Sequence, residues 1–200
     1  MPPATRVEVK STETPQPDRT VKVKPDPQVL LEQIRKSNAV ITQSSDDHEK
    51  ASAWLALQEA EEELLPILPN APGETCYDPH SANVLLGCPG REIVEEAQAE
   101  GADIGYCGSG ESWIEGTHGY KEYLLLWPDG SKADRAFWKT AVEPPCCDEC
   151  SPSDDSGISN VMKNYSAFLE KFPNSSLKGD AERKLQEYET LLKTHDSVKR

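Results

Sequence analysis

The sequence has no apolar stretch long enough to cross a membrane. Its longest candidate, EYLLLW from Glu122 to Trp127, falls far short of the roughly 20 apolar residues that a spanning helix needs. The first ten residues, MPPATRVEVK, also lack the apolar core of a signal peptide. We therefore predict no membrane span. Either the chain is made without a leader, or Met1 stands where a leader has been removed.

Basic residues are scarce. The chain carries 21 lysines and arginines against 35 aspartates and glutamates, which gives a formal net charge of −14. Such a surface repels the phosphates of nucleic acids and the headgroups of anionic lipids. The balance excludes nucleic acid as a natural partner and suits solubility or the attraction of basic partners.

Core-forming residues are also few for 200 residues. Only 36% of the chain is hydrophobic, and 16 prolines fall mostly in connecting segments. Residues 1–26 combine several of these prolines with threonines, lysines and acids, a composition that cannot bury enough apolar surface to fold. We predict a disordered N-terminal spacer at 1–26 and a modest folded core after it.

A helical hairpin is predicted over residues 27–69. Pro27 suits a first helical position, and the apolar residues from Leu30 to Ile41 follow helical spacing. Asp46 with Glu49 three residues later indicates the start of a second helix, which runs to about Leu65. The run EAEEE, residues 59–63, is expected on the solvated side of that helix.

A second helical hairpin is predicted over residues 153–200. Apolar residues recur at steps of three and four from Ile158 to Phe172 and again from Leu177 to Leu192, with PNSS between them. Stripes at this spacing usually form core.

The stretch NYSAFLEKFPNSSLKGDAERKLQEYETLL resembles a tetratricopeptide-type hairpin, and in particular those of bacterial outer-membrane and periplasmic assembly proteins. The resemblance covers about one repeat of 34 residues. A single repeat needs a neighbour to bury its faces, and the hairpin at 27–69 could be that neighbour. The positions that carry the resemblance are Tyr165, Phe168, Leu169, Phe172, Pro173, Asn174, Ser175, Ala181 and Leu185.

Between the hairpins lies a cysteine-rich segment, residues 70–152. PGREIVEEAQAEG (89–101) predicts a short helix, and DIGYC (103–107) and SWIEG (112–116) predict short strands. Two apolar runs, 121–127 and 133–142, flank Pro-Asp-Gly, which favours a β-hairpin. We predict a small antiparallel β module here.

All of the cysteines fall in that segment. An even number of cysteines in a small, core-poor module favours a disulfide framework and hence an oxidising compartment, that is, a periplasmic, cell-surface or secreted location. Spacing alone does not choose among the 15 possible pairings. The candidate half-cystines are Cys76, Cys88, Cys107, Cys146, Cys147 and Cys150.

Two alternatives use the same segment. Cys147 and Cys150 have the C-x-x-C spacing of a zinc site, and His80 with His118 could complete four ligands of a zinc-binding protein or a small zinc-dependent hydrolase. The other alternative is a module that recognises a glycan or a peptide on a tryptophan-rich sheet face, because exposed aromatic side chains anchor such ligands.

The preferred interpretation is an α+β protein. Two αα-hairpins, forming a bundle or a tetratricopeptide-like unit, would enclose a disulfide-stapled β module. The protein would be a non-enzymatic binding or structural subunit of a cell envelope or the extracellular space, with another protein as partner and no cofactor. Its candidate binding surface consists of Tyr123, Trp127, Trp138 and Trp113.

Overall fold

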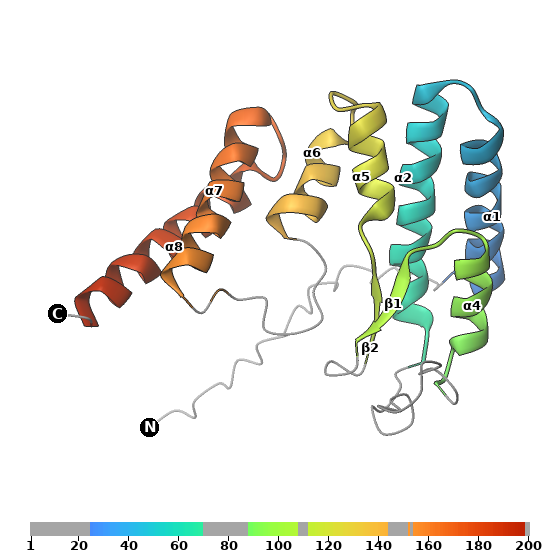
Figure 1. Cartoon of the computed structure of the whole chain (residues 1–200), viewed down its shortest axis with the longest axis horizontal. Helices are drawn as coiled ribbons and strands as arrows, with labels where there is room; N and C mark the ends of the chain where they lie inside the picture. Colours follow the sequence, from blue (N-terminus) through green and yellow to red (C-terminus); the bar gives the residue numbers. More distant parts are fainter. Residues whose placement is uncertain (1–24, 70–87, 108–111, 144–151, 153, 199–200) are drawn as a thin grey trace, which may run out of the picture.

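The computed structural model describes residues 25–69, 88–107, 112–143, 152 and 154–198 (Figure 1). These ranges are mostly helical and include one two-stranded antiparallel sheet, which confirms the α+β class. Within them, no helix combines the length and the apolar character that a membrane crossing requires. The spacer predicted at 1–26 lies outside the described residues except for Pro25 and Asp26.

The first hairpin forms as predicted. Helix α1 (Pro27–Gln43) has Pro27 in its first turn, and the side chain of Asp26 accepts a hydrogen bond from the backbone N–H of Gln28 at 2.9 Å. Asp46 caps helix α2 (Asp47–Leu64) in the same way, accepting from two backbone N–H groups. A 3₁₀ turn, η1 (Leu65–Ile67), follows α2.

The predicted short helix and strands are confirmed as α4 (Arg91–Ala99), β1 (Ile104–Cys107) and β2 (Ser112–Glu115). The strands pair antiparallel, with Ile104 opposite Glu115. They do not build a core of their own, because α1, α2, α4 and the sheet share a single apolar cluster that crosses the boundary predicted at 69/70. That cluster includes Leu30, Leu31, Ile34, Leu57, Leu64, Val94, Ala97, Ile104 and Trp113.

The β-hairpin predicted around Pro-Asp-Gly is wrong. The two apolar runs form helices: α5 (His118–Leu126), α6 (Ala133–Phe137) and a π-helical turn, η2 (Trp138–Val142). Gly119 explains how α5 lies so close to α2. A Cβ atom there would stand 2.7 Å from the backbone oxygen of Trp54 and 2.9 Å from Cβ of Gln58. Tyr120 and Tyr123, one helical turn apart, are consequently buried.

The C-terminal hairpin is confirmed as α7 (Asp155–Lys171) and α8 (Lys178–Val198). It packs against η2 through a ring-rich cluster, so the predicted boundary at 152/153 does not separate two cores. The buried members of this cluster are Trp138, Val142, Tyr165, Phe168 and Ala181.

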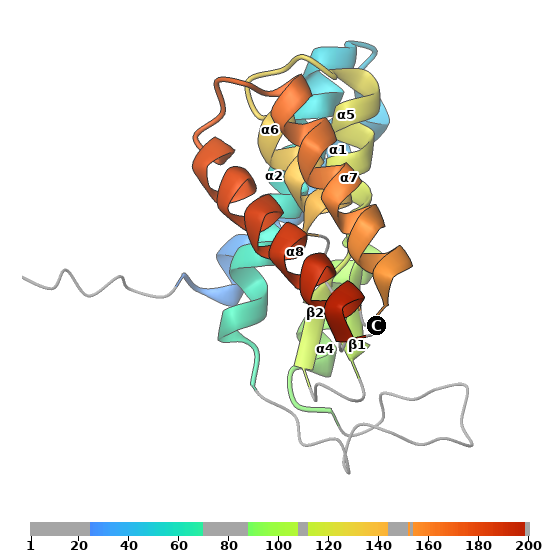
Figure 2. The same cartoon turned by 90° about the vertical axis from the view of Figure 1, so that its left-hand side faces the viewer.

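The described helices therefore form three successive hairpins, α1–α2, α5–α6 and α7–α8, where two were predicted. Figure 1 shows α1, α2, α5, α6 and α7 following one another across the molecule. In both views the hairpin turns lie at the upper ends of the helices, whereas α4 and the sheet lie lower, near the opposite ends of α1, α2 and α5 (Figures 1 and 2).

Candidate functional site

The aromatic residues predicted to form a binding surface are mostly in the core. Tyr123, Trp113 and Trp138 are 1%, 7% and 8% exposed, so they cannot serve as an open face. Tyr123 and Trp138 are buried because their segments fold as helices, whose aromatic stripe turns inward, rather than as strands with two faces. Trp113 lies on β2 as predicted, but it packs into the cluster shared by α1, α2 and α4. Trp127 alone of the four is half-buried and reaches a surface groove.

Of the four ligands of the alternative zinc site, only His118 lies in the described part of the chain. Cys147, Cys150 and His80 lie outside the described residues. His118 packs edge-on against the indole of Trp54, with ring centroids 4.8 Å apart. Among the residues with described positions, no three histidines, cysteines or acids are grouped to hold a metal ion.

Two of the six predicted half-cystines are described. Cys88 and Cys107 are both buried, and neither is a free thiol. No disulfide joins two described cysteines, and the other four cysteines lie outside the described residues. The pairing, and the stapling of the whole segment, stay predictions.

An apolar groove of about 660 Å³ lies along α1 and α2, near the end where the hairpin turns gather. The second half of α1 contributes Ser37 and Val40, the first half of α2 contributes Ala53 and Ala56, and Trp127 closes one end. Small side chains on α2 create the hollow, and Val40 stays 39% exposed on its rim. The volume falls in the range of roughly 300–1,000 Å³ that is usual for binding pockets.

The indole of Trp127 is held firmly in this groove. It stacks on the ring of His48, with centroids 4.5 Å apart and planes 20° apart. The backbone N–H of Trp127 donates to the carbonyl of Tyr123 and ends α5. Gly130 lies against both aromatic residues, because an added Cβ would come 2.8 Å from the Trp127 ring and closer still to the hydroxyl of Tyr123.

Polar and charged side chains accompany the apolar lining of the groove. The hydroxyl of Ser52, in its lining, donates to the backbone oxygen of His48 at 2.8 Å and is not aimed at the imidazole as a nucleophile would be. Lys36 and Glu49 lie at the groove with opposite charges. The surface offers apolar burial flanked by one cation and one anion.

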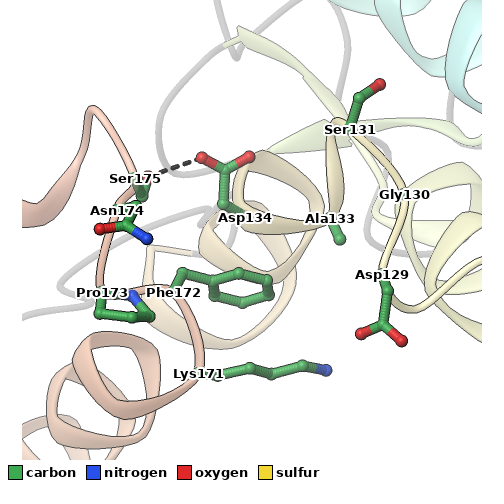
Figure 3. Close-up of a pocket in the computed structure, with 10 residues that line it drawn as sticks. All are labelled: Asp129, Gly130, Ser131, Ala133, Asp134, Lys171, Phe172, Pro173, Asn174 and Ser175. Carbon is green, nitrogen blue, oxygen red and sulfur yellow. Dashed lines mark hydrogen bonds between the residues drawn. The ribbon is translucent and has the colours of Figure 1, made fainter.

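A second, smaller hollow of about 340 Å³ lies where the α5–α6 turn meets the α7–α8 turn (Figure 3). The hydroxyl of Ser175 donates to the carboxylate of Asp134 at 2.6 Å, across the two turns. The ammonium of Lys171 stands 5.4 Å from the ring centroid of Phe172 and 5.7 Å from that of Phe137. These polar and charged groups already have partners within the hollow. We therefore interpret the hollow as a contact between two hairpins.

Beneath the surface, the acids of α2 join the neighbouring elements, which corrects the expectation that residues 59–63 are solvated. Glu62 accepts from the hydroxyl of Tyr120 at 2.7 Å and pairs with Arg135 at 2.7 Å and with Lys139 at 3.0 Å. Burial alone raises the pKa of Glu62, but the hydrogen bonds from Tyr120 and Lys139 and the nearby cations outweigh it and lower the pKa. Glu61, next to it, is completely buried.

The sequence indicated Trp127 as a binding residue but missed the rest of the groove. Val40, Ala53 and Ala56 carry no motif, so no sequence pattern indicated that they line a groove. Comparisons with family models, curated proteins and solved structures gave no match to this chain.

Proposed function

We propose that this protein is a non-enzymatic protein-binding scaffold that docks a partner protein in the groove formed by α1, α2 and Trp127. The supporting observation is the groove itself. It is an open apolar hollow in which a half-buried tryptophan is held by His48 and Gly130. Tryptophan is among the residues that most often dominate binding energy at protein interfaces.

The partner would present apolar side chains flanked by charge. The groove buries apolar atoms at its centre and has Lys36 and Glu49 as its charged residues, which is the usual anatomy of a protein interface. The row of three hairpins gives the groove a rigid backing, as the tetratricopeptide resemblance of residues 164–192 would imply.

The compartment is a cell envelope or the extracellular space. Cys88 and Cys107 are buried and neither is a free thiol. This supports an oxidising compartment, because disulfides persist there. Intact mass measured without reduction, after thiol alkylation, tests it. Three disulfides lower the mass by six hydrogens and leave no alkylated cysteine, whereas six alkylated thiols contradict an oxidising location.

Site-specific photo-crosslinking tests the docking. A photoreactive residue replacing Val40, at the groove rim, should give one discrete adduct in the native source. The same residue replacing Leu125, which is 74% exposed on α5 and away from the groove, should not. Equal labelling at both positions would mean non-specific contact.

A matched pair of variants then separates groove binding from folding. Ala56→Leu fills the groove and should abolish the adduct, whereas Ala39→Leu adds the same volume on an exposed position of α1 outside it. An adduct that survives Ala56→Leu unchanged would remove the groove from the interface.

A further inference from the structure

Glu61 of α2 is a carboxyl group with no exposed surface. Its Oε1 accepts a hydrogen bond from the backbone N–H of Asp103 at 2.8 Å, immediately before β1. Its Oε2 accepts from Nε2 of Gln58 at 2.8 Å, one turn earlier in the same helix. Glu61 therefore connects the start of β1 to the C-terminal part of α2.

Gln58 extends the tie to the second strand, at the same end of the sheet. It is also completely buried, its Nε2 donates to the carbonyl of Gly116 at 3.1 Å, and its Oε1 accepts from the N–H of Gly119 at 3.1 Å. The pair consequently holds both the entry to β1 and the link between β2 and α5. The two strands are antiparallel, so Asp103 and Gly116 lie side by side at one end of the strand pair, and breaking the contact of Glu61 would loosen that end.

The charges that act on Glu61 are all negative. They belong to Glu62 of the same helix, Asp103 before β1 and Glu115 of β2. The nearby cations are engaged elsewhere: Arg135 of α6 pairs with Glu59 and Glu62, and Lys139 of η2 pairs with Glu62 and Glu115. In the described part of the chain, no cation pairs with Glu61. Its ionised form would be a buried charge without a counter-charge, which is costly.

We propose that Glu61 is a proton-operated latch, whose protonated carboxyl holds the β1–β2 pair on α2 in acid and releases it as the medium becomes neutral to slightly alkaline. The latch lies at the sheet end of the molecule, away from the apolar groove. It would thus be a regulatory device independent of the proposed docking.

The direction follows from linkage. Burial raises the pKa of Glu61 most, the hydrogen bond from the N–H of Asp103 lowers it, and the three neighbouring acids raise it further. The net pKa is about 8, against an ordinary value of 4.5 in the exposed, open form. Between these values, opening releases a proton. The ratio of open to closed molecules therefore grows about tenfold for each pH unit and levels off above pH about 8.

Amide hydrogen exchange on the full chain, corrected for intrinsic rates, measures this opening. From pH 5.5 to 7.5, protection of the amides of Asp103 and Gly119 should fall about a hundredfold. Amides of α7 in the same sample serve as the reference, since they do not contact the latch. Protection at Asp103 and Gly119 that keeps a constant ratio to that of α7 would overturn the proposal.

Two glutamine variants identify the group. Glu61→Gln has no proton to lose, so the pH dependence should vanish, whatever the variant does to the overall level of protection. Glu63→Gln, at an exposed position of the same helix, should keep the wild-type slope. A slope that persists in Glu61→Gln overturns the proposal.

A direct titration decides the matter even if Glu61→Gln fails to fold. The side-chain carboxyl ¹³C signal of Glu61 in the wild-type protein should titrate with a midpoint near 8. A midpoint near the ordinary value of 4.5 would show that the buried carboxyl is already ionised at neutral pH, and would overturn the latch.

Discussion

The two joints between hairpins are built from different chemistry. Where α2 meets the sheet, α5 and α6, the contacts include buried carboxylates and amides: Glu61, Gln58 and the group formed by Glu62 with Tyr120 and Arg135. Where η2 meets α7, the contacts are aromatic. The ring of Phe168 lies 5.1 Å from Trp138, 5.4 Å from Phe172 and 6.3 Å from Phe137. We expect the first joint to respond to protons and salt, and the second to depend on buried apolar area.

The largest effect is expected at the aromatic joint. Phe168 is fully buried, so Phe168→Ala should remove about 3–5 kcal/mol from the free energy of unfolding of the part that contains α7 and α8. Chemical denaturation gives the magnitude, and limited proteolysis shows where the chain loosens. Cleavage should concentrate in residues 155–198, and equal loosening of α2 would show that the two joints are not independent.

An intermediate effect is expected at the polar joint. Arg135→Met leaves Glu59 and Glu62 without their shared guanidinium, although Lys139 and Tyr120 still contact Glu62. Because the Arg135 side chain is 37% exposed and partly screened by solvent, the expected loss is about 1–2 kcal/mol.

The salt dependence sharpens that prediction. The difference between wild type and Arg135→Met in the denaturation midpoint should shrink in high salt, whereas the loss caused by Phe168→Ala should not. Lys121→Met, at an exposed position of α5, is the matched control and should change little at any salt concentration.

The smallest effect is expected on the surface of α8. Arg183 pairs with Asp180 at 2.9 Å and with Glu187 at 3.0 Å, but all three side chains are more than half exposed. Arg183→Gln should therefore leave the thermal midpoint unchanged within error. A clear drop would mean that surface pairs carry stability that the comparison above assigns to the two joints.

The sequence predicted the helices whose ends carry clear chemical signals. Asp46 and Pro27 marked the starts of α2 and α1, and the spacing from Ile158 to Phe172 marked α7. It failed at residues 118–142, because a short apolar run beside Pro-Asp-Gly is compatible with either a strand or a helix. The steps from Tyr120 to Tyr123 and on to Trp127 are helical, but Pro-Asp-Gly after them is equally typical of a β-hairpin turn.

A local sequence pattern does not show which residues of a helix are buried by other helices and strands. Glu61 lies in a run of acidic residues, a pattern that is typical of a solvent-exposed helix face. It is buried because Asp103, immediately before β1, packs against it. The groove was missed for a similar reason, since Ala53 and Ala56 form a hollow only once α1 and Trp127 stand beside them.

Gly119 has a consequence for recognising other chains built this way. A side chain at this position would collide with the backbone of α2, whereas a Cβ at Gly179 would meet nothing within 4 Å. Descendants of a common ancestor that keep this architecture should therefore retain glycine at the position of 119 and drift freely at that of 179. Glycine at 119, a Gln and a Glu three residues apart on the facing helix, and the Trp-Pro-Asp-Gly turn form a signature that could outlast overall sequence similarity.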